Sequence, residues 1–196
     1  PRSALVAPGP ALSAAERTRH ARHLLLPGVG EEGQRRLANA RVLLVGAGGL
    51  GSPAALYLAA AGVGTLTIVD DDLVDLTNLQ RQILHGERDV GRRKVDSARD
   101  AVSRIAGATT VHTVDRRLDE SSVLPLVADP DLAIDGAGPE APRDGGLDGV
   151  RRGLQRVGPA RDDPVRSGVP WQIAMAASRG VSARPRAVSC TNPVRA

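Results

Sequence analysis

A glycine-rich turn and an acidic residue in the first half of the chain have the types and spacing that bind a nucleotide. The turn reads G-A-G-G-L-G at positions 46–51 and follows an apolar run at 41–45. A second apolar run, at 65–69, ends at Asp70, 19 positions after the last glycine of the turn. Strand, turn, helix, strand and acid in this order form a dinucleotide-fold fingerprint, in which N–H groups face phosphates and the acid binds ribose. Alone, this pattern fits NAD, FAD and an adenine nucleotide equally well.

Each glycine of the turn has its own expected task. The first makes the tight turn, the middle ones let the backbone approach a phosphate, and the last packs the following helix against the strand. The candidate cofactor-binding residues of the turn are Gly46, Gly48, Gly49 and Gly51. Three acids follow the second apolar run, and clustered carboxylates repel one another unless they face a cation, a helix end or hydroxyl groups. We expect Asp70 to bind the ribose, with Asp72 as the second candidate.

Amide, guanidinium and ammonium groups come next in the chain. The box T-N-L-Q-R-Q spans positions 77–82 and supplies hydrogen-bonding groups beside the expected phosphate site. Its candidate binding residues are Thr77, Asn78, Leu79, Gln80 and Arg81. Among 26 basic residues only one, Lys94, is a lysine. A compact ammonium delivers its charge to a phosphate oxygen as a point, unlike a planar guanidinium, so we expect Lys94 at the phosphates. The alternative interpretation of both features is an ordinary solvated surface.

The elements expected around these residues alternate between strands and helices. Ser13 and Glu16 form a capping-box pattern that predicts a helix running towards Leu24. Further helices are predicted at 31–38, at 53–61, at 94–105 and from Asp119 or Ser121 to Val127, and strands at 41–45, 65–69, 110–114 and 132–134. This order predicts an α/β fold: a Rossmann-like, doubly wound, mostly parallel sheet with N-terminal helices. Ligands bind beyond the carboxyl ends of the strands in such sheets.

Length and composition bound the class of protein. The 196 residues include 41% hydrophobic residues and no Phe, which suits one domain with a core of Ala, Val, Leu and Ile. No apolar stretch approaches the length of a membrane helix, and residues 1–10 lack the regions of a signal peptide, so we expect a cytoplasmic protein without a membrane partner. The net charge of +4 arises beyond residue 135 without interleaved aromatic residues, so nucleic acid is not an expected partner. The four histidines are scattered, and we expect no role for them in the site.

From Arg19 to Asp135 the chain resembles the ubiquitin-activating-like adenylyltransferases that charge small sulfur-carrier proteins for molybdopterin and thiamine synthesis, the MoeB, ThiF and MoeZ group. The resemblance covers more than half of the chain and rests on a series of motifs rather than on one. The matching segments are R-H-A-R-H-L-L-L-P from 19, G-A-G-G-L-G from 46, A-G-V-G from 61, D-D-D from 70, N-L-Q-R-Q from 78, V-G from 90 and K-V-D-S-A from 94.

This resemblance implies an ATP-dependent adenylyltransferase, a nucleotidyltransferase that acts as a homodimer. By position, Gly49 resembles a glycine that touches ATP, and Asp70 resembles the ribose ligand. The implied catalytic residues are Arg22, Arg81 and Lys94, with Arg22 reaching the triphosphate bound to the other subunit. The implied partner is a ubiquitin-like sulfur carrier, whose C-terminal glycine carboxylate attacks the α-phosphate of ATP. Pyrophosphate then leaves and an acyl-adenylate remains, while Mg²⁺ and the basic side chains offset negative charge.

Beyond residue 135 the sequence departs from that family. Gly138 stands where an aspartate would bind Mg²⁺, so no metal ligand is predicted and activity is expected to be impaired. The two Cys-x-x-Cys pairs of zinc-binding members are absent, and Cys190 is the single cysteine, so zinc is not expected. We hypothesise a reading-frame shift near codons 136–138. The alternative is a truncated or degenerate paralogue.

The expected organisation has three parts: a disordered N-terminus at 1–12, a ThiF-type nucleotide-binding adenylation domain at 13–138, and an irregular, low-order basic tail at 139–196. Within the tail, only 169–177 has the composition of a strand. Two other functions remain open. An NAD(P)-binding Rossmann oxidoreductase would need a catalytic acid or base that the sequence does not offer, whereas a non-catalytic nucleotide-binding module is favoured by the loss at Gly138.

Overall fold

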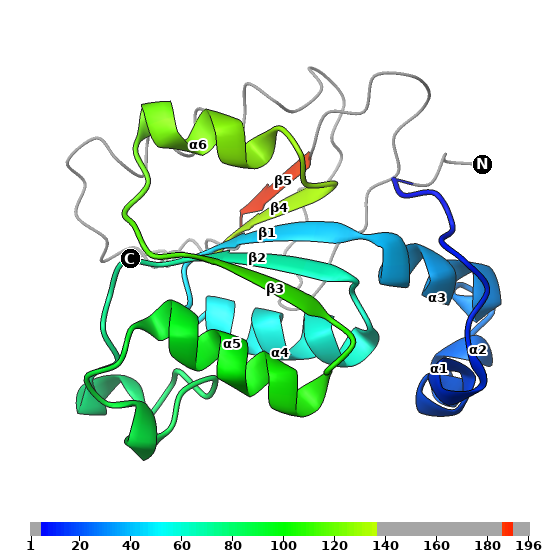
Figure 1. The fold of residues 1–196 in the computed structure, drawn as a ribbon, viewed down its shortest axis with the longest axis horizontal. Helices are drawn as coiled ribbons and strands as arrows, with labels where there is room; N and C mark the ends of the chain where they lie inside the picture. The colour runs from blue at the N-terminus through cyan, green and yellow to red at the C-terminus, as the bar shows by residue number, and fades with distance from the viewer. Residues whose placement is uncertain (1–4, 137–185, 190–196) are drawn as a thin grey trace, which may run out of the picture.

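Five parallel strands form one sheet in the order β3-β2-β1-β4-β5. The computed structural model describes residues 5–136 and 186–189, drawn in colour in Figure 1. The strands are β1 (Arg41–Val45), β2 (Thr65–Val69), β3 (Thr110–Val114), β4 (Leu132–Asp135) and β5 (Arg186–Ser189). The pairing of β1 with β2 and β4 places Val45 beside Val69 and Asp135. The carboxyl ends of these three strands therefore meet at one edge of the sheet.

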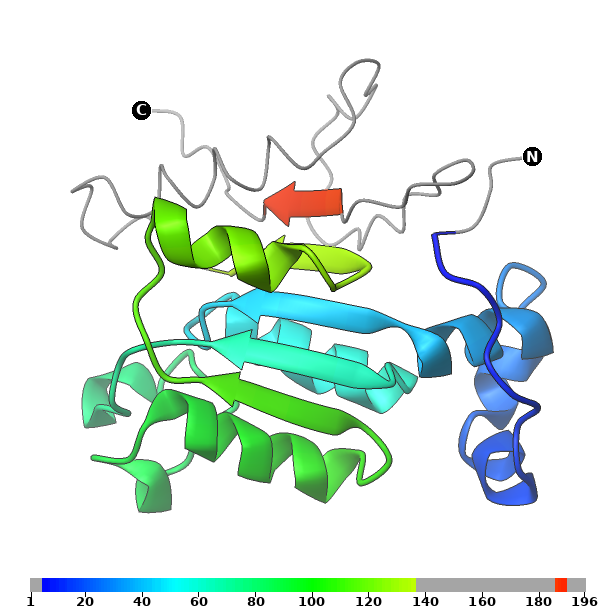
Figure 2. The same cartoon turned by 45° about the horizontal axis from the view of Figure 1, so that its top comes forward.

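Helices cover both faces of this sheet and one of its ends. α4 (Gly51–Ala61) and α5 (Lys94–Ile105) lie on one face, and α6 (Glu120–Val127) lies on the other (Figure 1, Figure 2). The N-terminal helices lie at the end where the strands begin, and they are α1 (Ala14–Arg19), α2 (Ala21–Leu24) and α3 (Gly30–Asn39). The predicted doubly wound, parallel α/β fold with N-terminal helices is confirmed. Among the helices described, none has the length and apolar character of a membrane span.

The two faces of the sheet carry separate hydrophobic cores because side chains alternate along a strand. In β1, Val42 and Leu44 belong to the core beneath α4 and α5, while Leu43 and Val45 belong to the core beneath α6. Both leucines are fully buried. Burial of one leucine side chain stabilises a fold by about 1.5–3 kcal/mol relative to exposure. The two cores therefore hold β1 from both sides, and β1 carries the glycine turn at its end.

The predicted helix from Ser13 to Leu24 is present but broken. The capping box between Ser13 and Glu16 forms as expected. At His20 the backbone leaves helical geometry, with φ −101° and ψ 17°, and α2 begins one residue later. The buried His20 ring lies against Gly62, where a Cβ would be 2.8 Å from the ring. The break turns the ring into this contact at the end of α4.

Residues 5–12 are attached to α3, which differs from the disorder expected for the N-terminus. The guanidinium group of Arg35 donates to the carbonyl of Gly9 at 2.6 and 2.8 Å. Asn39 donates to the carbonyl of Ala7 at 3.1 Å, and Leu12 is buried. The order of this segment could not be predicted from its composition, because backbone carbonyl groups hold it in place and every residue type has one.

β5 is a strand that the sequence analysis did not predict. R-A-V-S at 186–189 pairs in parallel with β4, from Leu132↔Arg186 to Asp135↔Ser189. Val188 is the one large apolar residue of this segment, so no strand pattern stands out from the surrounding tail. The strand predicted at 169–177 lies outside the described residues.

The predicted α6 is confirmed, with the Asp119 carboxylate accepting the N–H of Ser122 at 2.8 Å.

Candidate nucleotide-binding site

A tight glycine turn joins the end of β1 to the start of α4. Gly46 has a φ of 91°, a left-handed conformation that glycine adopts without strain. Its N–H donates to the carbonyl of Val69 at 2.7 Å, which ties the turn to the end of β2. A Cβ at Gly51 would lie 1.8 Å from the carbonyl oxygen of Gly46. The turn therefore requires glycine at both ends, for its conformation at the first and for a close backbone contact at the last.

The middle of the turn is open. A Cβ at Gly48 would have Gln82 Nε2 as its neighbour at 3.8 Å, and one at Gly49 would lie 3.7 Å from the Arg81 side chain. The N–H groups of Gly48, Gly49 and Leu50 donate to no acceptor within the part of the chain that the structure describes. Free N–H groups at the start of a helix, together with the positive end of the helix dipole, form an anion site. This geometry suits a phosphate group.

Asp70 fastens the glycine turn to the end of β2. One carboxylate oxygen accepts the N–H of Ala47 at 2.7 Å, and the other accepts the N–H of Asp72 at 2.9 Å. Burial raises the pKa of the Asp70 carboxyl group, an effect opposed by these two hydrogen bonds and by the positive charge of Lys94. Each oxygen keeps another lone pair, so the same carboxylate can accept hydrogen bonds from ribose hydroxyls.

Lys94 reaches this edge because the connection after β2 folds back on itself. The N–H of Lys94 donates to the carbonyl of Asp72 at 3.0 Å, and the N–H of Val74 donates to the carbonyl of Arg92 at 2.9 Å. These bonds close the loop and bring the Lys94 ammonium to 2.7 Å from Asp72 Oδ2. The lysine is buried and the aspartate is exposed. A buried cation therefore ends next to the acids that follow β2.

The T-N-L-Q-R-Q box forms a turn beside the glycines. A 3₁₀ turn, η1 (Leu76–Asn78), begins at Asp75, whose carboxylate accepts both the N–H and the hydroxyl of Thr77, at 2.8 and 2.6 Å. Arg81 is exposed and lies over Gly49, with Nη1 3.4 Å from the carbonyl of Thr77. The fold thus brings Arg81 to the glycine turn, whereas the hydroxyl of Thr77 is directed to Asp75.

The other box residues differ in their exposure. Gln80 is exposed, while Asn78 and Leu79 are half-buried. Gln82, the last residue of the box and not one of the predicted binding residues, is 4% exposed, and its Oε1 has no hydrogen-bond partner among the described residues. A buried carbonyl without a partner is unfavourable by about 1–3 kcal/mol. The Gln82 amide lies beside Gly48, so this unsatisfied polar group belongs to the wall of the site.

The three carboxylates at 70–72 lie within 4.8 Å of one another. Asp70 accepts two backbone N–H groups, and Asp72 accepts the Lys94 ammonium. These partners offset the charge that would attract a divalent ion. Gly138, the predicted substitute for a magnesium ligand, lies outside the described residues. We therefore assign no metal ligand within residues 5–136.

Arg22 lies at the opposite end of the sheet from the glycine turn. It is exposed on α2, which lies with α3 where the strands begin (Figure 1). The turn at 46–51 follows the last residue of β1. A strand of five residues is about 16 Å long, too far for an arginine side chain to span. The structure therefore does not bring Arg22 to Arg81 and Lys94 within one chain.

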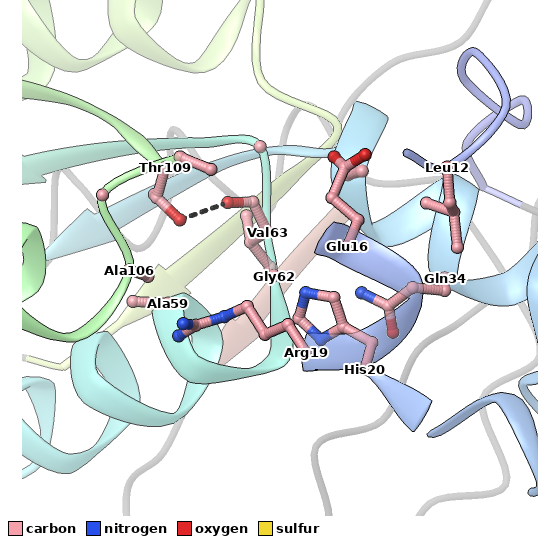
Figure 3. Close-up of a pocket in the computed structure, with 14 residues that line it drawn as sticks. Leu12, Glu16, Arg19, His20, Gln34, Ala59, Gly62, Val63, Ala106 and Thr109 are labelled. Carbon is pink, nitrogen blue, oxygen red and sulfur yellow. Dashed lines mark hydrogen bonds between the residues drawn. The ribbon is translucent and has the colours of Figure 1, made fainter. Parts of the chain in front are cut away.

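A small cavity also lies at this N-terminal end. Its volume is about 140 Å³, and its lining includes Arg19, His20, Gln34 and Thr109 (Figure 3). The Thr109 hydroxyl donates to the carbonyl of Val63 at 2.8 Å across one wall. Pockets for drug-sized ligands are about 300–1,000 Å³, so a nucleotide does not fit here. None of the predicted site residues lines this cavity.

Two buried residues outside the predicted site contact the glycine turn or each other: His85, for which no role in the site was expected, and Ser97. His85 Nε2 lies 3.0 Å from the carbonyl oxygen of Ala47, and His85 Nδ1 lies 2.9 Å from Ser97 Oγ. Burial lowers the pKa of His85. The available signal was position alone, since His85 follows the box by three residues and Ser97 follows Lys94 by three. A single histidine or serine in such a segment forms no recognisable pattern.

The parallel sheet, the open glycine turn and the acid after β2 define a Rossmann-like α/β fold with a site that suits a nucleotide. Residues 20–138 match the ThiF family, and the chain belongs to this family. The predicted resemblance to the MoeB, ThiF and MoeZ group is confirmed at this level.

Curated relatives are similar over the same part of the chain. A Mycobacterium tuberculosis (strain H37Rv) protein named "Probable adenylyltransferase/sulfurtransferase MoeZ" is 54% identical over 132 residues, which are 67% of this chain and 34% of the relative. The molybdopterin-synthase adenylyltransferase of Escherichia coli (strain K12) is 48% identical over 124 residues, 63% of this chain and 50% of the relative. The chain thus spans from a third to a half of these relatives.

Solved structures support the same fold. The E. coli tRNA N6-threonylcarbamoyladenosine dehydratase TcdA in complex with ATP has a TM-score of 0.67 at 28% identity, covering 75% of this chain and 58% of that chain. Its complex with AMP has a TM-score of 0.61 at 31% identity, covering 65% and 51%. Both of these similar structures hold an adenine nucleotide.

Proposed function

We propose that this chain is the nucleotide-binding part of an ATP-dependent adenylyltransferase, with its adenylation domain at 13–138, that acts in the cytoplasm. Its substrate is the C-terminal glycine of a ubiquitin-like sulfur-carrier protein of the molybdopterin or thiamine type. Membership of the ThiF family supports this proposal, as do two relatives named as adenylyltransferases. One of these names refers to molybdopterin synthase.

One observation carries the proposal: an anion-binding turn with two cationic side chains beside it. The N–H groups of Gly48 and Gly49 are free within the described chain, Arg81 lies over Gly49, and the Lys94 ammonium ends at Asp72. A dinucleotide-binding turn alone would serve NAD as well as ATP. Two cations beside the turn favour a triphosphate, because its negative charge is higher and grows further on the departing group during reaction.

The reaction needs orientation and positive charge more than proton transfer. A carboxylate oxygen of the terminal glycine forms a bond to the α-phosphorus, and the bond from that phosphorus to the oxygen bridging to the β-phosphate breaks. Pyrophosphate leaves with the electron pair, and an acyl-adenylate remains. A terminal carboxyl group, with a pKa of about 3.5, is ionised at neutral pH, so no general base is required. Asp70 would orient the ribose, while Arg81 and Lys94 would offset charge on the leaving pyrophosphate.

Arg22 enters this proposal through a homodimer. Its position at the far end of its own sheet supports a role in the site of a second copy of the chain, as the family resemblance implies. A two-fold dimer would place each Arg22 against the partner's glycine turn. In this arrangement each site is completed by an arginine from the partner, and a monomer lacks that third cation.

We further propose that this chain binds ATP better than it turns ATP over. Mg²⁺, when bound, supplies positive charge to the phosphates and the departing pyrophosphate. Gly138 offers no side-chain ligand for it. Ground-state binding rests on the turn, Asp70, Arg81 and Lys94, together with Arg22 from the second copy of the chain, and all of these residues are present. Only interactions that are stronger in the transition state raise the rate, so binding and catalysis separate.

A reading-frame shift beyond codon 135 remains our explanation for the missing aspartate. Translation of the other two frames of the coding DNA tests it directly. We expect one of them to give Asp-Asn and a further α/β sequence. If neither frame does so, the sequence beyond residue 135 is a genuine divergence from the family.

Nucleotide binding separates this function from its alternatives. We expect equilibrium binding of ATP, weak binding of NAD⁺, and near-background pyrophosphate exchange with a matching sulfur carrier. An Asp70→Ala chain should lose about 1–3 kcal/mol of ATP binding free energy, the value of a hydrogen bond to a charged acceptor. Tighter binding of NAD⁺ than of ATP would favour an oxidoreductase. Robust Mg²⁺-dependent exchange by the unmodified chain would contradict the impaired activity.

A further inference from the structure

The peptide units on both sides of Ala47 are held by hydrogen bonds. The N–H of Ala47 donates to Asp70 Oδ2 at 2.7 Å, and its carbonyl oxygen accepts from the His85 ring, with Nε2 at 3.0 Å, and from the Ser52 hydroxyl at 3.2 Å. Ala47 is fully buried and His85 is 6% exposed. Ala47 immediately precedes the open glycines at 48–49. Any rotation of the peptide plane that follows it would therefore change the direction of their N–H groups.

The hydrogen on the His85 ring is assigned by its two neighbours. A carbonyl oxygen only accepts, so Nε2 carries the hydrogen that bonds to Ala47. Nδ1 of the neutral ring then accepts from the hydroxyl of Ser97. Burial favours this neutral ring by lowering its pKa. The ring is thus a fixed donor, oriented by a serine on α5.

We infer that His85 is a positioning residue for the nucleotide site: its bond to the Ala47 carbonyl keeps the N–H groups of the glycine turn aimed at the phosphates. This inference rests on the proposed function, because it takes the turn to be a phosphate site. The residue touches no phosphate itself and acts through the backbone of Ala47.

The physical reason is preorganisation. Donors that already point at a charge stabilise it without a reorganisation cost, and a turn free to rotate would lose that advantage. The Ser52 hydroxyl belongs to the same turn and helix, so it moves with them. His85 is 38 residues further along the chain and belongs to the segment that follows Arg81. It therefore fixes the turn relative to a separate part of the site.

Three substitutions test this role. His85→Leu removes the donor while keeping a side chain of similar bulk. His85→Gln restores an amide N–H near the position of Nε2. His20→Leu is the matched control, because His20 is also a buried histidine with a pKa lowered by burial, and it lies at the opposite end of the sheet.

Two measurements are made on the full chain. The first is amide hydrogen exchange without ligand at Ala47 and Ser52, whose N–H groups bond to Asp70 and to the carbonyl of Gly48. The second is the affinity for ATP divided by the affinity for adenosine, which lacks the phosphates. For His85→Leu we expect faster exchange at these two amides and a fall of about tenfold in ATP affinity, with adenosine affinity unchanged. His85→Gln should recover most of both losses, and His20→Leu should change neither the exchange of the two amides nor the affinity ratio.

Unchanged exchange at Ala47 and Ser52 in His85→Leu would overturn the inference, as would equal losses for ATP and adenosine. The inference also fails if His85→Gln behaves like His85→Leu, because bulk or folding would then explain the effect. Failure of the proposed function looks different. In that case the unmodified chain binds no ATP, while hydrogen exchange still reports whether His85 holds the turn.

Discussion

Lys94 and Asp72 form an ion pair at the edge of the nucleotide site, with Lys94 Nζ 2.7 Å from Asp72 Oδ2. The lysine side chain is 6% exposed and the aspartate side chain is 64% exposed. The lysine ammonium is therefore shielded from water, whereas the aspartate carboxylate is solvated. A phosphate oxygen can replace the carboxylate at such a pair without leaving the lysine unpaired. The released aspartate would be solvated.

This relationship gives opposite expectations for two substitutions. Asp72→Asn removes the competing charge, so ATP affinity should rise, by about threefold or more, while the free energy of unfolding falls by about 1 kcal/mol. Lys94→Met removes the cation but keeps the length of the side chain, so ATP affinity should fall by about tenfold or more. Isothermal titration measures both affinities, and urea denaturation measures both stabilities.

The same experiment tests whether Asp72 binds ribose, the role for which the sequence makes it the second candidate. A ribose ligand would make Asp72→Asn weaken ATP binding. Lys94→Arg is the control for charge alone, and we expect it to recover part of the loss seen in Lys94→Met, because a guanidinium cannot deliver charge as a point. Full ATP affinity in Lys94→Met would remove Lys94 from the site.

The glycine turn offers a second pair of contrasting substitutions. A Cβ at Gly51 would lie 1.8 Å from the Gly46 carbonyl oxygen, whereas one at Gly48 meets nothing closer than 3.8 Å. Gly51→Ala should therefore lower the free energy of unfolding by about 1–3 kcal/mol or more, since backbone has to move. Gly48→Ala should stay within about 0.5 kcal/mol of the unmodified chain.

ATP affinity separates these two variants in a different way. Gly48→Ala fills the space that a phosphate would occupy, so it should bind ATP weakly although it is stable. Differential scanning fluorimetry with and without ATP shows this as an unchanged melting temperature and a lost ligand-induced shift. An unchanged shift in Gly48→Ala would mean that phosphate does not bind over the turn.

The strands and the glycine turn could be predicted because their signals are local. β1 is apolar from its second residue to its last, and β2 combines two threonines with Leu, Ile and Val, which is a composition typical of strands in a parallel sheet. Gly46, Gly51 and Asp70 stand at spacings that follow from the geometry of one β-α-β unit. A short window of sequence contains all of this information.

The remaining contacts could not be predicted, because they depend on how distant segments meet. The break at His20 exists because its ring packs on Gly62, which follows another helix. The bonds from His85 to Ala47 and from Lys94 to Asp72 both require the loop after β2 to close. The residue types of that loop can be read from the sequence, but the course of its backbone is known only from the structure.

Stability should depend on pH through two buried histidines. Burial lowers the pKa of His20 and His85 from their ordinary value of 6.5. Below pH 6.5 these histidines therefore bind protons in the unfolded chain but not in the folded chain. Their contribution to the free energy of unfolding is fully present above pH 6.5 and is lost as the pH falls towards the folded pKa. The slope is at most about 1.4 kcal/mol per pH unit for each histidine, the limit for one proton. Urea denaturation between pH 8 and about pH 5 measures it.

The Asp70 carboxyl group changes stability with pH in the opposite direction, so its effect must be distinguished from that of the histidines. Its pKa is raised, so the folded chain takes up a proton first, and stability rises as the pH falls through that raised value. His20→Gln and His85→Gln should each flatten the loss below pH 6.5, while Asp70→Asn should leave the histidine slope in place. A slope that is unchanged in both histidine variants contradicts the assignment.

The position of Arg22 leads to a prediction about assembly. If each site takes its Arg22 from the partner, a chain with Arg22→Ala and a chain with Arg81→Ala can complement each other. Each variant alone should be folded and bind ATP weakly. In a hybrid dimer, one site carries both substitutions and the other carries neither. With random mixing, about a quarter of all sites should recover the affinity of the unmodified chain.

Titration of the mixture with ATP reports this recovery as a tight-binding fraction that neither variant shows alone. Arg17→Ala is the matched control, because Arg17 lies on the same arm and pairs with Glu31 at the surface, and it should keep full affinity. Native mass spectrometry establishes whether hybrids form. If they form and no tight sites appear, Arg22 does not act across the dimer interface.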